Sequence, residues 1–263
     1  MKPMKRNQLI RGARRSLVPL FKSSISQLPS LAGHYVAFFR SWRQFRRLGG
    51  LAPADEFRLY LFDRTAHSQT GGHPYFFQDV WALQKLAALK PRQHHDVGSR
   101  LDGFVGQATS LCPVVFWDIR PPNFSLPNLE YRNGSILEMP LRDWSVLSLS
   151  CLHTIEHIGL GRYGDAIDPQ GTDKAMRELA RILAPGGQLF LSCPIGRERV
   201  CFNAHRILHP ERAIQLLPEL SLKEFSAVGD LDNGSYHFFR DAIPKDFAKA
   251  DEALGLYVFV RPT

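Results

Sequence analysis

The feature that most constrains the fold is a stretch in which two short apolar runs flank a glycine turn and a helix-length segment. The first run ends at Asp96 and Gly98, Gly103 follows, and the second run ends at Asp118, 22 residues after Asp96. This order predicts a strand, a turn, a helix and a parallel strand. An acid at the end of the second strand, about 20 residues beyond the first turn, suits the two hydroxyls of a ribose. The stretch therefore predicts a nucleoside site in an α/β fold.

The turn itself narrows the choice of nucleoside. Residues 98–103 read Gly-Ser-Arg-Leu-Asp-Gly, which lacks the lysine and hydroxyl of a phosphate loop and the second glycine of a dinucleotide motif. Asp96 would repel a phosphate, but it suits a ligand that carries an ammonium and a sulfonium group. S-adenosylmethionine (SAM) is such a ligand. A turn that binds no ligand is the alternative, because a single D-x-G-x turn is a weak motif.

Length and cysteine usage indicate an intracellular α/β domain. The 263 residues, 44% of them hydrophobic, fit one domain of ordinary size with a peripheral segment. Three of the four cysteines lie in or beside apolar runs, and no two form a C-x-x-C pair. They are expected to be small buried side chains in a reducing compartment. We therefore expect a cytoplasmic protein.

The positive charge is concentrated at the N-terminus. Residues 1–54 hold 11 Lys and Arg and no acid, so a net charge of +8 for the chain leaves −3 for the remainder. The sequence thus divides into a basic extension, residues 1–54, and an α/β domain, residues 55–263. Since the excess of bases belongs to the extension, we expect no nucleic-acid binding by the domain.

The extension contains a predicted helix over residues 31–47. Phe38, Trp42 and Phe45 fall at helical spacing with arginines between them, which gives one aromatic face and basic flanks. No apolar run approaches the ~18 residues of a membrane span, although the Arg- and Ser-rich start overlaps with organellar transit peptides. Two interpretations remain open: a helix packed on its own domain, or an interfacial helix on an anionic membrane, such as the inner membrane face, or on a protein partner.

The rest of the chain alternates between helical and strand patterns. Helices are predicted over 74–89, 100–111, 172–184 with a Thr172 cap, and 210–217; strands are predicted over 114–117, 129–131, 145–152, 188–193, 222–228 and 256–260. Alternation of this kind predicts a doubly wound, mostly parallel sheet with helices on both faces.

Four motifs together resemble the class I SAM-dependent methyltransferases. They are D-x-G after the first strand, an acid after the second, G-S-I-L-x-M-P-L from Gly134, and A-P-G-G from Ala184. The segments 151–165 and 202–206 further resemble an uncharacterised branch, domain of unknown function 268. The resemblance runs from Tyr75 to the C-terminus and leaves residues 1–54 outside.

The resemblance implies a Rossmann-like fold, SAM as cofactor and a set of cofactor-binding residues. These are Asp96, Gly98, Ser99 and Gly103 toward the methionine end, Asp118 and Ile119 at the ribose, Ser135 and Ile136 at the adenine, and His153 under the cofactor. The sequence departs from the family pattern at Arg100, where a second glycine is usual, and at Ser135, where an acid is usual. Both departures keep a catalytically silent, ligand-binding relative as an alternative.

Residues 153–157 also match a competing motif. His153-Thr154-Ile155-Glu156-His157 is H-x-x-E-H, the inverted zinc-protease signature. It follows an apolar strand directly and is interrupted by Gly159, so the helix that such a zinc site needs has little room. We expect no metal. Glu156 and His157 could also merely brace the fourth strand.

The loop from Gly159 to Gly171 is the predicted place for the methyl acceptor, because ligands bind at the carboxyl edge of open α/β sheets. Its polar residues Arg162, Tyr163 and Asp165, with Asn203 after the fifth strand, are predicted to bind a small or glycan hydroxyl. His157, Glu156 and His205 are the candidate catalytic residues, with a histidine removing the proton of the acceptor. The prediction is a SAM-dependent O-methyltransferase.

Overall fold

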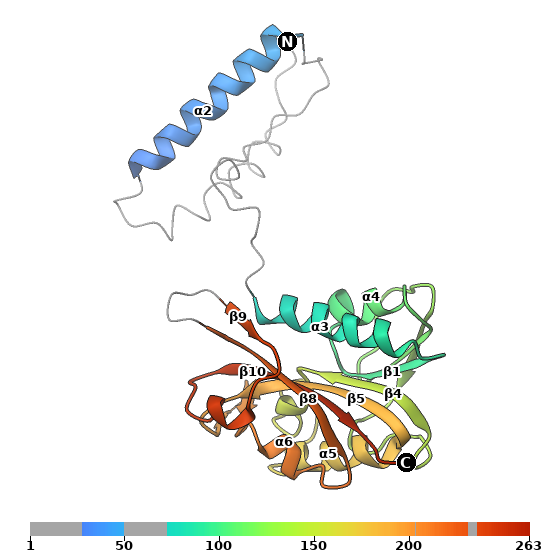
Figure 1. The fold of residues 1–263 in the computed structure, drawn as a ribbon. Coiled ribbons are helices and arrows are strands. Elements are labelled where there is room, and N and C mark those ends of the chain that lie inside the picture. Colours follow the sequence, from blue (N-terminus) through green and yellow to red (C-terminus); the bar gives the residue numbers. More distant parts are fainter. Residues whose placement is uncertain (1–27, 50–72, 203, 231–235) are drawn as a thin grey trace. The chain divides into compact units, whose positions relative to one another are not determined.

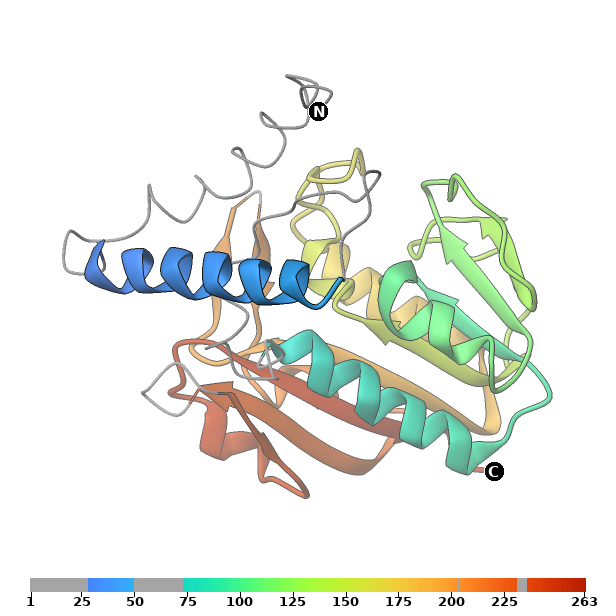
Figure 2. The same cartoon turned by 90° about the horizontal axis from the view of Figure 1, so that it is seen from above.

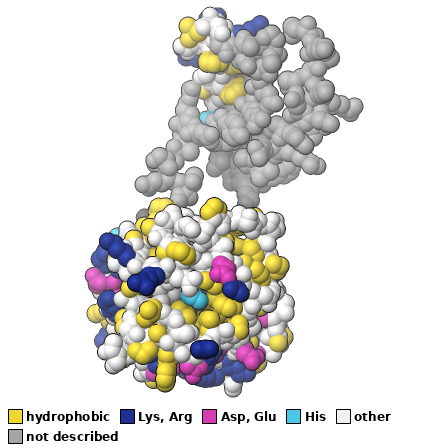
Figure 3. Space-filling view, turned by 90° about the vertical axis from the view of Figure 1, so that its right-hand side faces the viewer, with side chains coloured by type: hydrophobic (Ala, Val, Ile, Leu, Met, Phe, Trp, Pro, Cys, Tyr) yellow, Lys and Arg dark blue, Asp and Glu magenta, His cyan; other side chains and the backbone are white. Residues whose placement is uncertain are grey.

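The computed structural model describes residues 28–49, 73–202, 204–230 and 236–263. The chain divides into two compact units, residues 1–70 and 71–263. The predicted boundary at residues 54 and 55 lies outside the described residues. Residues 1–70 hold 13 of the 33 Lys and Arg and 3 of the 25 Asp and Glu. The second unit therefore holds 20 basic and 22 acidic residues. Acidic and basic side chains are accordingly interspersed on the face of that unit shown in Figure 3.

The described part of the first unit is the helix α2, Leu28–Arg47. It confirms the helix predicted from the spacing of the aromatic residues. Arg46 and Arg47 lie in its last turn, where a positive charge interacts favourably with the helix dipole. Phe39 and Phe45 are 40% and 55% exposed, so the helix presents aromatic side chains to its surroundings. None of the described helices has the length and apolar character needed to cross a membrane.

The second unit is built on one eight-stranded sheet with the order β3-β2-β1-β4-β5-β10-β8-β9 (Figures 1 and 2). The strands are β1 (His94–Val97), β2 (Val114–Asp118), β3 (Leu129–Asn133), β4 (Val146–Leu152), β5 (Leu183–Ile195), β8 (Ser221–Asp230), β9 (Tyr236–Phe239) and β10 (Ala253–Val260). Neighbours among the first five are parallel, whereas β10 is antiparallel to both β5 and β8, and β9 to β8. The predicted mostly parallel sheet is confirmed.

Helices cover both faces of the sheet, as a doubly wound fold requires (Figure 1). On one face, α3 (Pro74–Leu89) and the short α4 (Gly106–Ala108) bury Trp81, Leu86 and Ala108 in a core cluster with the sheet. On the other, α5 (Gly171–Ile182) and α6 (Arg212–Gln215) contribute to a second cluster. The predicted helix 74–89 is confirmed residue for residue, because its apolar positions recur at three- and four-residue steps.

Three predicted helix boundaries are wrong. The helix expected over residues 100–111 is a π-helical turn, Leu101–Val105, followed by α4, because Gly103 has non-helical backbone angles (φ −121°, ψ −118°). Thr172 lies inside α5 and donates its hydroxyl to the carbonyl of Ile155 at 2.8 Å, so it does not cap the helix. α5 ends at Ile182, before the Pro-Gly-Gly segment, which lies within β5.

Two further turns and one hairpin complete the unit. The 3₁₀ turns are η3 (Ile155–His157) and η4 (Pro244–Phe247). The hairpin of β6 (Arg199–Cys201) and β7 (His205–Ile207) stands apart from the main sheet and was not predicted. Both η3 and the hairpin follow carboxyl ends of parallel strands, β4 and β5. They therefore contribute to the edge at which a ligand is expected.

Candidate functional site

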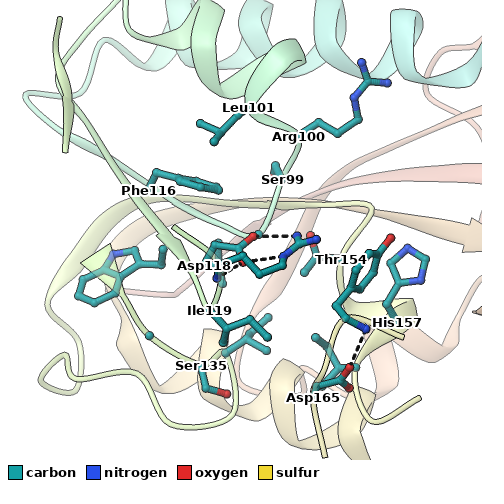
Figure 4. Close-up of a pocket in the computed structure, with 18 of the residues that line it drawn as sticks. Ser99, Arg100, Leu101, Phe116, Asp118, Ile119, Ser135, Thr154, His157 and Asp165 are labelled. Carbon is teal, nitrogen blue, oxygen red and sulfur yellow. Dashed lines mark hydrogen bonds and ion pairs between the residues drawn. The ribbon is translucent and has the colours of Figure 1, made fainter. Parts of the chain in front are cut away.

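A cavity of about 880 Å³ lies at the carboxyl ends of β1, β2 and β4. That volume is in the range of pockets that enclose a small-molecule ligand. Its walls are Tyr75 and residues from the segments 97–101, 116–122, 134–137, 153–158 and 163–166. Figure 4 shows Ser99, Asp118, Ile119, Ser135, His157 and Asp165 around it. The sequence-predicted turn, second-strand acid and acceptor loop are thus brought to one cavity.

The turn after β1 requires glycine at position 98. Gly98 has φ +72°, a left-handed conformation that side chains with a Cβ rarely adopt. A Cβ there would lie 2.6 Å from the Cγ2 of Thr154. The Gly98 amide donates to the carbonyl of Trp117 at 2.9 Å, which ties the turn to the end of β2. Position 98 therefore brings bare backbone to the cavity wall.

Asp96 shapes this turn from behind and does not line the cavity. The carboxylate is fully buried, and it accepts hydrogen bonds from the Ser99 amide (3.1 Å), the Ser99 hydroxyl (2.6 Å) and the Ser150 hydroxyl. Burial raises its pKa from 3.8 to about 6, while these donors act in the opposite direction. Asp96 therefore acts on the cavity by fixing Ser99, which does line it.

His94 completes a buried polar chain behind the turn. Its ring lies between the hydroxyls of Ser148 (2.7 Å) and Ser150 (2.8 Å). Because the Ser150 hydroxyl donates to Asp96, it accepts from Nε2–H of His94, and Nδ1 then accepts from Ser148. Burial lowers the pKa of His94 to about 3, so the ring is neutral. The chain fixes the side chain of Asp96 with every donor matched to an acceptor.

Asp118 ends β2 inside the cavity, where the acid for a ribose is predicted (Figure 4). Its carboxylate is already engaged by Arg120, which donates from its amide (2.8 Å), its Nε (3.1 Å) and its Nη2 (3.1 Å). Sequence reasoning missed Arg120. The signal was the spacing, since an arginine two residues after an acid can fold back onto it.

The wall predicted to face the adenine comes from the loop after β3. Ser135 and Ile136 both line the cavity, as predicted, and so does Ile119 from the loop after β2. The Ser135 hydroxyl accepts from the amide of Leu137 at 3.2 Å. Ile136 is 6% exposed and belongs to the core, whereas Ile119 is 40% exposed. This wall combines apolar surface with a hydroxyl, which suits the faces and edge of a purine.

Glu156 joins the two histidines of the H-x-x-E-H segment. Its side chain is fully buried, and its Oε1 lies 2.7 Å from Nδ1 of His153 and 3.7 Å from Nε2 of His157. Its Oε2 has no hydrogen-bond partner. His153 lies on the cavity wall with φ +52°, an uncommon conformation for a residue other than glycine. Glu156 thus orients the ring of His153 so that Nε2 points away from the buried carboxylate.

His157 also lines the cavity, and its proton arrangement follows from one contact. Nδ1 lies 2.7 Å from the carbonyl of Ala204, which can only accept, so Nδ1 carries the hydrogen. Burial lowers the pKa of His157, although Glu156 acts against the shift. The neutral ring therefore has its lone pair on Nε2. The segment forms a three-residue 3₁₀ turn, not the helix of a zinc motif, and the described residues contain no group of three metal-binding side chains arranged for an ion.

The predicted acceptor residues divide into two groups. Tyr163 and Asp165 line the cavity, and both oxygens of Asp165 accept amide hydrogens, from Gly159 (2.6 Å) and Tyr163 (3.3 Å). Arg162 lies outside the lining and donates to the carbonyl of Ala204 at 3.0 Å. Three other predicted site residues also lie outside the lining: Gly103, Glu156 and His205. Nε2 of His205 lies 3.5 Å from Oε1 of Glu252. Asn203 lies outside the described residues.

Arg206 is a second residue that sequence reasoning missed as an organiser of the site. It is 7% exposed, and its guanidinium donates to the carbonyl of Ile158 (2.6 Å), the hydroxyl of Thr172 (3.2 Å) and the carbonyl of Asp168 (3.4 Å). Burial lowers its pKa. These bonds close both ends of the loop that carries Tyr163 and Asp165. Arg206 therefore holds one wall of the cavity in place although its own side chain does not line the cavity.

Comparison with known proteins agrees with this fold. Residues 146–225 match the family model described as "Caenorhabditis protein of unknown function, DUF268". A "putative methyltransferase" from Bacillus halodurans C-125 superposes with a TM-score of 0.50 at 16% identity, over 70% of this chain and 99% of that one. The second unit has the class I methyltransferase fold. The match to the family model covers β4, α5, β5 and the first half of β8, and it includes the H-x-x-E-H segment and residues 159–171.

Two other solved structures are similar. The [4+2]-cyclase SpnF has a TM-score of 0.51 at 13% identity, over 74% of this chain and 86% of that one. N-methyltransferase NodS from Bradyrhizobium japonicum WM9, solved with S-adenosylhomocysteine, has a TM-score of 0.48 at 14% identity, over 73% and 89%. No curated protein matches the sequence significantly. Identities this low show the fold alone.

Proposed function

We propose that the cavity binds SAM and that the protein transfers its methyl group to a hydroxyl of a small or glycan acceptor. The observation that carries this proposal is the position of Asp118. Its carboxylate, 9% exposed, stands in the cavity at the end of β2, between the glycine turn after β1 and the Ser135-Ile136 wall. A nucleoside that spans turn, acid and wall would leave its ribose hydroxyls on Asp118.

The residues present fit this cofactor. The turn at Gly98 exposes backbone without a Cβ, the Asp118 carboxylate is a strong acceptor for two hydroxyls, and Ile136 with Ile119 offers apolar surface to a base. Bound SAM would supply an electrophilic methyl on sulfur. The protein then aligns the acceptor for in-line attack and takes up the proton that the acceptor loses.

His153 and His157 are the candidates for that proton. Both line the cavity, and each has its Nδ1 engaged, by Glu156 and by the carbonyl of Ala204 respectively. In the tautomer that these contacts favour, Nε2 is the nitrogen left with a lone pair in each ring, and that of His157 lies 3.7 Å from Oε1 of Glu156. His205, also predicted as a base, lies outside the lining. Its ring centroid is 6.4 Å from that of His157, so its role would be to support the hairpin beside His157. Tyr163 and Asp165 would contact the acceptor.

A catalytically silent binding protein is the second candidate. Arg100 lines the cavity where the family usually has glycine, and Arg120 occupies the acid that the ribose needs. The fold alone does not choose between chemistries, since a solved structure with a similar fold is a cyclase. A protein of this kind would bind the nucleoside and turn over no acceptor.

Calorimetry with S-adenosylhomocysteine (SAH) and SAM tests the proposal, preceded by thermal shift with SAH, NAD and zinc to compare ligand classes. Wild type is expected to bind SAH, and Asp118→Ala is expected to weaken binding by about 1.5–3 kcal/mol, the value of hydrogen bonds to a charged group. Asp143→Ala is the matched control, because Asp143 is 62% exposed, pairs with Arg181 and lies outside the cavity. Equal SAH affinity of wild type and Asp118→Ala would remove the site assignment.

A further inference from the structure

An ion pair closes over the acid of the candidate ribose site. Asp118 is 9% exposed, and Arg120, 54% exposed, covers its open side with Nε on one carboxylate oxygen and Nη2 on the other. A ribose bound at Asp118 needs acceptor sites that Arg120 already fills. An ionised carboxylate has about four lone-pair sites, of which the amide and Nε of Arg120 take both on Oδ1 and Nη2 takes one on Oδ2. Two ribose hydroxyls need more than the one site that remains. Cofactor binding and the Arg120 pair are therefore in competition.

A released Arg120 would remain at the cavity. Its guanidinium carbon lies 4.5 Å from the centre of the Tyr163 ring, and that of Arg162 lies 5.1 Å from the same ring. Both distances are in the range of cation–π contacts, which hold a guanidinium without using its N–H groups. Since Tyr163 belongs to the acceptor loop, the stack keeps the N–H groups of Arg120 beside the place predicted for the acceptor.

Asp118 is the carboxylate of the described cavity lining with which Arg120 forms an ion pair. Among the described residues that line it, the acids are Asp118 and Asp165. Asp165 already accepts amide hydrogens on both oxygens. Glu156 is buried against His153 and lies outside the lining. With Asp118 occupied by ribose, the guanidinium would face the acceptor without its ion-pair partner, and its planar fork matches a carboxylate or a phosphate.

We propose that Arg120 exchanges partners: it pairs with Asp118 when the cavity is empty and with an anionic group of the methyl acceptor, a carboxylate or a phosphate, when ribose occupies Asp118. The inference rests on the proposed binding of SAM at Asp118. It makes the binding of cofactor and acceptor mutually reinforcing, because the ribose releases Arg120 and the anion keeps it released.

The first test measures SAH affinity of Arg120→Gln by calorimetry. Removal of the competing guanidinium is expected to tighten SAH binding by up to about fivefold, the upper end of the range for an exposed ion pair. Arg132→Gln is the matched control: it removes the same charge from another half-exposed pair, with Glu130, outside the cavity. Both side chains are more than half exposed, so neither substitution threatens the core.

The second test uses the reciprocity of coupled binding. SAH affinity is measured in chloride, in acetate and in inorganic phosphate at matched ionic strength. One of the two anion buffers is expected to tighten SAH binding of wild type at least twofold, and to have no such effect on Arg120→Gln. The buffer that acts identifies the anion class, carboxylate for acetate or phosphoryl for phosphate.

The outcomes separate this proposal from the one on which it rests. If wild type fails to bind SAH in every buffer, the proposed function fails. If wild type binds SAH but Arg120→Gln binds it equally or more weakly, the partner exchange is wrong. If neither anion strengthens SAH binding, or if each does so equally in Arg120→Gln, the anionic acceptor is wrong.

Discussion

The buried carboxylate of Asp96 predicts an unusual dependence of stability on pH, which Asp96→Asn should remove. Burial raises the pKa of Asp96 from 3.8 to about 6. Between these two values the folded protein holds a proton on Asp96 that the unfolded chain has lost, so the free energy of unfolding falls as pH rises. This difference in pKa between the folded and the unfolded chain corresponds to ~3 kcal/mol. That contribution is present below the unfolded pKa and is lost as pH rises through the folded pKa.

Urea unfolding followed by tryptophan fluorescence checks this magnitude, because Trp81 and Trp117 are buried in the two core clusters. The difference in unfolding free energy between Asp96→Asn and wild type should increase by about 2–2.5 kcal/mol from about pH 4 to about pH 7, most of the full ~3 kcal/mol. The amide also replaces one acceptor oxygen of the Ser99 and Ser150 hydrogen bonds, but that loss gives an offset that does not change with pH.

The control is Asp102→Asn, the same substitution on a carboxylate that is 81% exposed. Arg100 lowers the pKa of Asp102, so its contribution has the opposite sign: it is present above the unfolded pKa and is lost as pH falls. A difference between wild type and Asp96→Asn that stays constant across this pH range would refute the reasoning. So would a difference that changes in the direction expected for Asp102.

Three further predictions concern the turn, the base and the extension. Gly98→Ala should abolish SAH binding and destabilise the fold by at least ~1–2 kcal/mol, because φ is +72° at this position and a Cβ would lie 2.6 Å from Thr154. Calorimetry and urea unfolding check this, and unchanged SAH affinity would contradict it. If His157 is the base, the rate of methyl transfer should rise with pH through a value below the usual histidine pKa of 6.5, because burial lowers the pKa of His157. His157→Ala should lower turnover roughly 10²–10⁴-fold and leave SAH affinity intact. Activity that survives both His157→Ala and a chelator would leave His153 as the base. If residues 1–54 contact membranes, flotation with anionic vesicles should fall with salt and vanish on their removal, and equal flotation without them would contradict this role.

Sequence patterns predicted the elements whose residues are determined by local periodicity. α3, β2 and β4 lie where apolar spacing places them, and β1 lies where the glycine turn that follows it indicates. The turn and the acid that these strands carry meet in one cavity. The failures have a different origin. The helix expected over residues 100–111 is instead a π turn, because Gly103 has non-helical backbone angles. Gly103 packs closely against α3, where an added Cβ would lie 2.5 Å from Asp79. A single sequence does not reveal contact between segments so far apart.

The candidate site shows the same limit for side chains. Asp118 was predicted in its place, but its pairing with Arg120 was not, since the pattern of an acid after a strand says nothing of which partner its oxygens take. The role of Arg206 depends on the carbonyls of Ile158 and Asp168, 48 and 38 residues away in the chain. Asp96 was expected to face the ligand, and it is instead fully buried behind Ser99. Residue type and spacing identified the positions, whereas tertiary contacts determine their partners.

A crystal structure of the protein with SAH tests the central claim most directly. The account predicts the nucleoside in the cavity, with both ribose hydroxyls within hydrogen-bond distance of the Asp118 carboxylate, the adenine against Ser135 and Ile136, and Arg120 released from Asp118. A nucleoside bound elsewhere, or one in the cavity with its ribose away from Asp118 and the Arg120 pair intact, would contradict it.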